Sequence, residues 1–143
     1  MDFFSEQELA HQAEGNAAAI FLVTAVYLKE QGLETKGWTE HLGKVFSPTW
    51  DESCASSAKE TVRLMARNIV SMGGTLERID GDAHRATGTV TWPPSDLLAE
   101  FGASPEGADS VWDVYQPIAE YLGVDYEWHR SGPAVEVSVA LRT

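Results

Sequence analysis

The aromatic side chains are the groups of this sequence best suited to bind a small molecule, and five of its 143 residues are tryptophans. Large rings that face one interior can line an apolar pocket, although the same rings can also pack as solid core. The pocket wall that the sequence predicts consists of Trp50, Gly88, Trp92, Trp112, Tyr115 and Trp128. The glycine would leave room on the pocket floor. The ligand would be a small apolar or aromatic molecule.

Two polar residues could orient such a ligand or act on it. His84 alternates with Ala86 and Val90 in a predicted strand, which would place its imidazole on the inner face. A neutral imidazole there could act as a general base, whereas a half-exposed histidine at the rim is the structural alternative. Asn68 borders the apolar face of a predicted helix and could offer its amide. We therefore take His84 as the candidate catalytic residue and Asn68 as a candidate ligand-binding residue.

The single cysteine, Cys54, excludes an intramolecular disulfide and is typical of a reducing compartment. It falls on an apolar stripe without an evident partner base, which favours a buried structural thiol over a nucleophile. No two His or Cys residues have the spacing of metal ligands such as HxxxH or CxxC. The GxSxG motif and the glycine motifs that bind phosphates or dinucleotides are absent from the sequence. We expect no metal and no cofactor.

Charge and length restrict the class of protein. A net charge of −12 argues against nucleic acid and against anionic membrane surfaces as partners. The first ten residues contain no basic region followed by an apolar run, so we expect no signal peptide and a cytoplasmic protein. A chain of 143 residues with 43% hydrophobic residues is long enough for a core, and we expect one domain over residues 1–143.

The most apolar stretch is Ala17–Leu28, in which only Thr24 is clearly polar. Twelve residues span roughly 18 Å as a helix, which is too short for a bilayer. We expect this stretch to be the central core helix, within a helix over Glu6–Gln31 that Ser5 and Glu8 begin with a capping box. A stretch this apolar can exceed what one small domain covers, which leaves a homodimer open.

Periodicity predicts the remaining elements. The expected helices are Thr39–Phe46, Asp51–Met72, Ser95–Phe101 and Ala108–Leu122, the last kinked at Pro117. The expected strands form two hairpins, Thr75–Ile79 with His84–Trp92 and Val124–His129 with Val135–Leu141. This order predicts an α+β fold, with helices on one face of a four-stranded antiparallel sheet made of two hairpins.

The stretch Glu120–Leu141, EYLGVDYEWHRSGPAVEVSVAL, ends a helix at Leu-Gly and continues as strand, glycine turn and strand. Over Ser53–Leu141 the pattern resembles the ligand-binding fold of vinyl-reductase-type domains, haem-NO-binding domains and small TRAPP subunits. It is also similar to bacterial proteins grouped with L-2-amino-thiazoline-4-carboxylate hydrolase. The turn Ser131-Gly132-Pro133 lacks the cysteine with which vinyl-reductase-type domains often end, and the haem-binding Tyr-x-Ser-x-Arg motif is absent from the sequence. The resemblance implies a pocket between helices and sheet for a small, largely apolar molecule, and it does not imply haem.

Three functions follow from these observations. The leading one is a small-molecule binding protein with an aromatic-lined apolar pocket between helices and sheet. The second is a hydrolase or isomerase that uses the same pocket with His84 as general base. The third is a non-catalytic interaction subunit whose hydrophobic surface forms a homodimer.

Overall fold

The computed structural model describes residues 3–142, and its first element is the long helix α1 (Glu6–Glu30). The Ser5 side chain accepts a hydrogen bond of 3.0 Å from the Glu8 N–H, which confirms the predicted helix start. At the other end Gly32 has φ of +72°, and the Leu33 N–H donates to the Leu28 carbonyl over 2.9 Å. This is a Schellman-type ending, which glycine favours because it has no Cβ.

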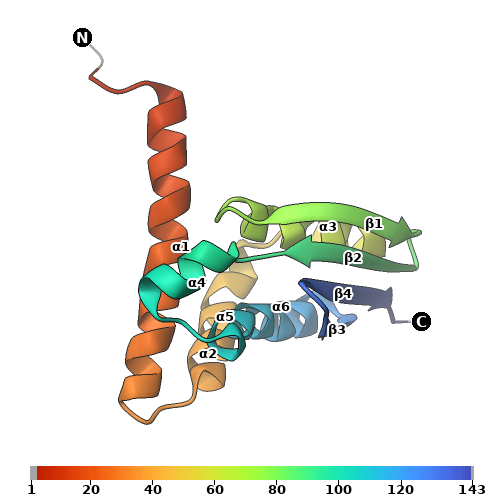
Figure 1. Cartoon of the computed structure of the whole chain (residues 1–143). Helices are drawn as coiled ribbons and strands as arrows, with labels where there is room; N and C mark the ends of the chain where they lie inside the picture. The colour runs from red at the N-terminus through yellow and green to blue at the C-terminus, as the bar shows by residue number, and fades with distance from the viewer. Residues whose placement is uncertain (1–2, 143) are drawn as a thin grey trace.

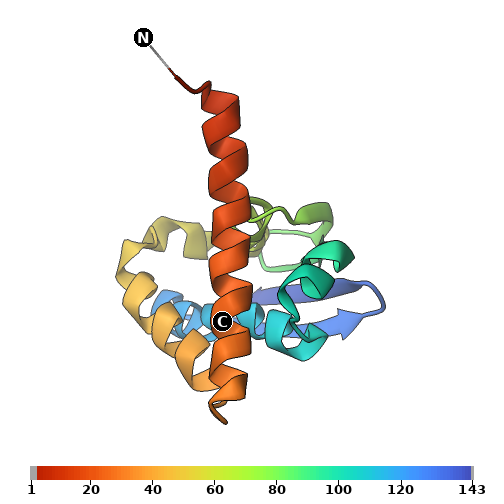
Figure 2. The ribbon, with the colours of Figure 1, turned by 60° about the vertical axis from the view of Figure 1, so that its left-hand side comes forward.

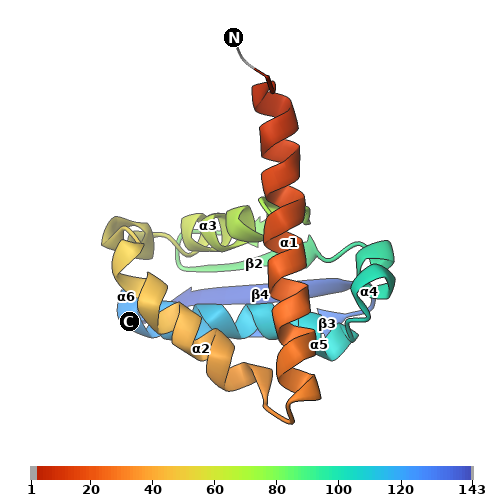
Figure 3. The same ribbon diagram turned by 90° about the vertical axis from the view of Figure 1, so that its left-hand side faces the viewer.

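Helix α1 lies on the surface of the molecule, so the expectation that it forms the centre of the core is wrong. Its buried residues are Ala18, Phe21, Leu22 and Ala25, which share one face. The N-terminal half extends beyond the rest of the chain in every view (Figures 1, 2 and 3). Apolar character all round a helix predicted burial, but the chain folds against only one side of this one.

The second helix, α2 (Thr35–Phe46), begins four residues earlier than expected and leads into the short 3₁₀ helix η1 (Ser47–Thr49). The expected single helix over Asp51–Met72 is divided into the 3₁₀ helix η2 (Glu52–Ser56) and α3 (Ala58–Val70). Ser57 is extended between them, and its side chain accepts a hydrogen bond from the Glu60 N–H. A serine in this conformation is an N-cap, so α3 begins after it.

The strands β1 (Thr75–Gly81), β2 (Arg85–Thr91), β3 (Val124–Ser131) and β4 (Ala134–Leu141) form one antiparallel sheet in the order β1-β2-β4-β3. The two hairpins meet along β2 and β4, where Ala86, Gly88 and Val90 are paired with Val139, Val137 and Val135. Helices α3 and α6 (Tyr115–Leu122) lie against one face of the sheet (Figure 3). The predicted α+β architecture is therefore confirmed.

Between the hairpins the chain forms α4 (Ser95–Phe101), α5 (Pro105–Asp109), the 3₁₀ helix η3 (Ser110–Val114) and α6. The expected continuous helix over Ala108–Leu122 is therefore wrong. The change of helix type comes before Pro117, which lies in the first turn of α6. Proline fits there because the N–H groups of a first turn have no partner within the helix.

The core lies between the inner face of the sheet and helices α3 and α6. Val62, Met65 and Ile69 of α3 are fully buried, as is Trp112 of η3. Ala18, Phe21 and Leu22 attach α1 to this core from the outside. Within residues 3–142 no helix has both the length and the apolar character that a membrane crossing requires.

Candidate functional site

The predicted hollow between sheet and helices is filled by the rings that were expected to line it. Trp92 is buried, and its indole N–H donates to the Met72 carbonyl over 2.9 Å. Trp112 is completely buried, with its ring centroid 6.0 Å from that of Tyr115. Both residues pack as core, which is the alternative that the sequence left open.

Gly88 does not leave room for a ligand, so its expected role as a pocket floor is wrong. A Cβ built on this residue would lie 2.6 Å from Cγ1 of Val62 and 3.5 Å from Cγ2 of Val137. Because real Cβ atoms do not approach other atoms within 3.0 Å, the glycine is needed for α3 to lie close to the sheet. The space above β2 belongs to a packed helix–sheet contact.

Trp128 and His84 also lie away from any common hollow. Trp128 is half-buried, and its indole N–H donates to Oδ1 of Asp113 over 3.1 Å, which joins β3 to η3. His84 is exposed in the turn between β1 and β2, outside the strand, so its expected place on the inner face is wrong.

The turn around His84 is organised by its backbone. The N–H groups of His84 and Arg85 both donate to Oδ1 of Asp82, over 2.8 and 3.1 Å. These bonds to His84 and Arg85 lower the pKa of the Asp82 carboxyl, because they stabilise its charged form. The His84 carbonyl accepts from the Leu141 N–H over 2.9 Å. His84 is thereby held by its backbone, and the residue is exposed.

An apolar pocket of about 390 Å³ opens instead among helices α1, α2, α3 and α6. Its lining comes from segments far apart in the sequence: Ala17, Phe21, Leu42, Phe46, Thr49, Trp50, Asn68, Ile69, Ser71, Met72, Val111, Val114, Tyr115 and Ile118. It therefore brings together three residues of the predicted site, which are Trp50, Asn68 and Tyr115. The remaining five predicted residues do not line it.

Tyr115 forms a rigid inner wall of this interhelical pocket. Its hydroxyl donates to the Met65 carbonyl over 2.8 Å, and its ring meets that of Trp50 edge to face at 6.2 Å. Burial raises the pKa of Tyr115 far above the ordinary value, and the nearby Asn68 amide opposes this only in part. The phenol is therefore neutral at physiological pH and presents an aromatic surface.

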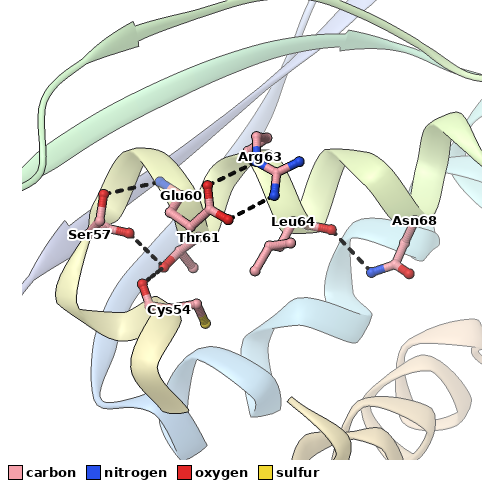
Figure 4. Close-up of polar contacts among 7 residues, drawn as sticks. All are labelled: Cys54, Ser57, Glu60, Thr61, Arg63, Leu64 and Asn68. Atoms are coloured by element: carbon pink, nitrogen blue, oxygen red, sulfur yellow. Dashed lines mark hydrogen bonds and ion pairs between the residues drawn. The ribbon is translucent and has the colours of Figure 1, made fainter. Parts of the chain in front are cut away.

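Asn68 is the polar side chain that α3 contributes to the pocket. Its Nδ2 donates to the Leu64 carbonyl over 3.3 Å, one turn earlier in the same helix (Figure 4). A bond of this length is near the upper limit for a hydrogen bond, and the residue is exposed. The amide can exchange this bond for one to a ligand without leaving a buried group unpaired.

Cys54 lies in η2, before the N-terminal end of α3, whereas Asn68 lies near the other end of that helix (Figure 4). The surroundings of Cys54 indicate a structural role. The thiol is buried, and burial raises its pKa. The Thr61 hydroxyl donates to the Cys54 carbonyl and to the Ser57 carbonyl, each over 2.9 Å, which joins η2 to α3. A thiol whose pKa is raised is a poor nucleophile at neutral pH.

Sequence reasoning missed the contribution of α2 to the pocket. Leu42 and Phe46 line it, and Phe46 is partly open to solvent. Both residues lie on the apolar side of a short helix, and the Ser47-Pro48 pair after them marks the helix end. That signal indicates an amphipathic helix but not the element it packs against. Residues 3–142 bring together no group of three His, Cys, Asp or Glu side chains suited to a metal ion.

Comparison with known proteins assigns the chain to no family. No family model matches the sequence, and no curated protein matches it either. The interhelical pocket is therefore the feature of the molecule that points to a function.

Proposed function

We propose that this protein binds a small, largely apolar molecule in the interhelical pocket, without catalysing a reaction on it. The observation that carries the proposal is the pocket itself, with a volume of about 390 Å³ and a lining of mostly apolar and aromatic side chains. Sites for small ligands commonly have volumes of about 300–1,000 Å³ and a few polar groups among apolar walls. The resemblance to ligand-binding folds implies the same class of molecule.

The side chains of the pocket narrow the chemistry of the ligand. Among the described lining residues, none is charged. An ionised carboxylate or phosphate would lose its hydration there without gaining a counter-ion, which disfavours anionic ligands. Trp50 and Tyr115 offer ring surfaces, and Asn68 can donate and accept one hydrogen bond each. The expected ligand is a neutral aromatic or aliphatic molecule with one polar group.

Binding without catalysis is favoured by where the candidate base lies. His84 is exposed in the β1–β2 turn and is not among the residues that line the pocket. General-base catalysis requires the base within hydrogen-bond reach of the proton that it removes. The hydrolase or isomerase hypothesis therefore has less support than ligand binding.

The test uses a neutral fluorescent probe, N-phenyl-1-naphthylamine, titrated into the full chain. We expect saturable enhancement of probe fluorescence, and we expect Trp50→Ala to weaken the affinity by about tenfold because one ring wall is lost. The matched control is Trp128→Ala, which removes an indole outside the pocket and should leave the affinity unchanged. Circular dichroism of both variants checks that they remain folded.

Two results would contradict the proposal. The first is the absence of saturable enhancement with the wild-type chain. The second is an equal loss of probe affinity in both folded tryptophan variants, since that would show that the probe responds to general hydrophobic surface.

A further inference from the structure

Helix α1 carries a regular apolar stripe on the side that faces away from the rest of the molecule. The stripe consists of Leu9, Ala13, Asn16, Ile20, Val23 and Tyr27. These residues follow one another at alternating intervals of four and three, which is the spacing of the a and d positions of a coiled coil. All six are exposed. We call them the outer stripe.

The outer stripe is large enough to matter energetically. The exposed fractions of its large side chains are 54% for Leu9, 69% for Ile20, 49% for Val23 and 58% for Tyr27. At roughly 200 Å² for a fully exposed large side chain, their open surface is roughly 450 Å² per chain. Two such stripes face to face would bury about 900 Å² from these residues alone, close to the roughly 1,200 Å² at which stable interfaces begin. Ala13, Asn16 and the flanking alanines add to this area.

The first part of α1, residues 6–13, packs against none of the other described elements. Every residue from Glu6 to Ala13 is exposed, and the helix projects past the other elements (Figures 1 and 2). A helical segment of this length is marginally stable in water without packing on one of its faces. The buried face of α1, formed by Ala18, Phe21, Leu22 and Ala25, lies opposite the outer stripe, so the body of the molecule does not obstruct the stripe.

We propose that the outer stripe pairs with the same stripe of a second copy of this chain, with the two α1 helices antiparallel. A repeat of a and d positions is self-complementary, because knobs of one helix enter holes of an identical one. No position of the stripe holds a charged residue. Asn16, its one amide, accepts a hydrogen bond of 2.8 Å from Gln12 Nε2 within the helix, which lowers the cost of burying it.

The distribution of side-chain sizes favours the antiparallel arrangement. The two small or polar residues, Ala13 and Asn16, lie in the N-terminal half, and the large Ile20, Val23 and Tyr27 lie in the C-terminal half. Antiparallel pairing about residue 18 places a large residue in every layer, so that small and large side chains interdigitate along the whole seam. Parallel pairing would place small residues against each other at one end and large ones at the other.

Charge favours the same arrangement. The N-terminal half of α1 holds Glu6, Glu8 and Glu14, whereas its last turn holds Lys29 and Glu30, whose charges cancel. Parallel helices would bring the three glutamates of both copies together, in a chain whose net charge is already −12. Antiparallel helices separate these glutamates from their copies in the partner and align the helix dipoles favourably.

The first test is sedimentation equilibrium of the full chain at micromolar concentration. We expect a mass of about twice the 15.6 kDa of one chain. Ile20→Glu should weaken association by roughly a hundredfold or more, because the two copies each place a carboxylate in the seam. The matched control is Val45→Glu on α2, which adds the same charge at another apolar residue that is 57% exposed, and which should remain dimeric. A monomeric wild type would overturn the proposal, and binding of that monomer to lipid vesicles in co-sedimentation would assign the outer stripe to a membrane surface. A dimer that survives Ile20→Glu would overturn the proposal as well.

The second test determines the orientation by disulfide trapping. Leu9 and Tyr27 are separated by about 27 Å along one helix, so cysteines at both positions cannot join within one copy. A mixture of the Leu9→Cys and Tyr27→Cys variants should give a crosslinked heterodimer under mild oxidation, whereas each variant alone should give little. Native Cys54 is buried, and oxidation of the wild-type chain under the same conditions shows whether this cysteine forms any crosslink. Efficient crosslinking of Leu9→Cys alone would show parallel helices and refute the antiparallel arrangement.

Discussion

The contact between Gly88 and Val62 can be tested with one methyl group. In Gly88→Ala the new Cβ would lie 2.6 Å from Cγ1 of Val62, a fully buried side chain that is stiff at χ1 because it is β-branched. Overpacking a well-filled core costs about 1–3 kcal/mol, whereas the lower entropy of the unfolded chain returns about 0.4–1 kcal/mol. We expect a net loss of roughly 1–2 kcal/mol in the free energy of unfolding, or roughly 3–6 °C in Tm.

The measurement is urea and thermal unfolding followed by circular dichroism, with a second variant that identifies the contact. Val62→Ala alone should cost roughly 2 kcal/mol, because it removes two buried methyl groups and leaves a small cavity. In the double variant the added methyl enters the space that was vacated. The combined loss should therefore fall short of the sum of the single losses by about 1 kcal/mol or more.

Gly15→Ala provides the matched control, because a Cβ there meets nothing within 4 Å and the residue is helical. It should raise the free energy of unfolding by about 1 kcal/mol. A Gly88→Ala variant that is as stable as wild type, or more stable, would refute the reasoning. It would show that α3 does not close on the sheet and that space for a ligand exists above β2.

Two further predictions concern other parts of the fold. Gly43→Ala should lower the free energy of unfolding in urea by about 3 kcal/mol or more, a larger loss than that of Gly88→Ala. The reason is that its Cβ would overlap the Val114 backbone carbonyl, which cannot rotate away as a side chain can. A small loss would show that α2 and η3 pack more loosely. Asp82→Ala should lower Tm at neutral pH by removing the acceptor for the N–H groups of His84 and Arg85. The pKa of Asp82 is lowered in the folded chain, so its contribution to stability is complete above about pH 4 and is lost as the pH falls through the folded value. The difference in Tm between wild type and Asp82→Ala should therefore shrink in acid, and a difference that stays constant or grows would contradict this account.

Much of the secondary structure could be read from local signals. Ser5 begins α1, as the capping box predicts, and Gly32 follows its end. The alternation of Val135, Val137 and Val139 correctly predicted a strand with one buried face. Capping and alternation depend on residues a few positions apart, so the sequence displays them directly.

The site was predicted less well, because it depends on contacts between distant segments. Trp50, Asn68 and Tyr115 do share a pocket, but that pocket lies among helices, and Phe21 of α1 is part of its lining. Trp92 was expected beside them, yet it makes its hydrogen bond to Met72 within the packed core. Periodicity identifies a buried face and cannot tell which of its rings will border an empty volume.

By itself the sequence determined where most of the helices and strands lie, which faces of the strands are apolar, and that the order of elements makes an α+β fold. Only the tertiary structure decided that α1 buries one side and leaves Ile20, Val23 and Tyr27 exposed, and that Gly88 admits a helix where a ligand was expected. The physical reason is the distance along the sequence over which each property is decided. Backbone conformation follows from neighbours within one or two turns, whereas burial depends on which surfaces remain available once every other element has packed.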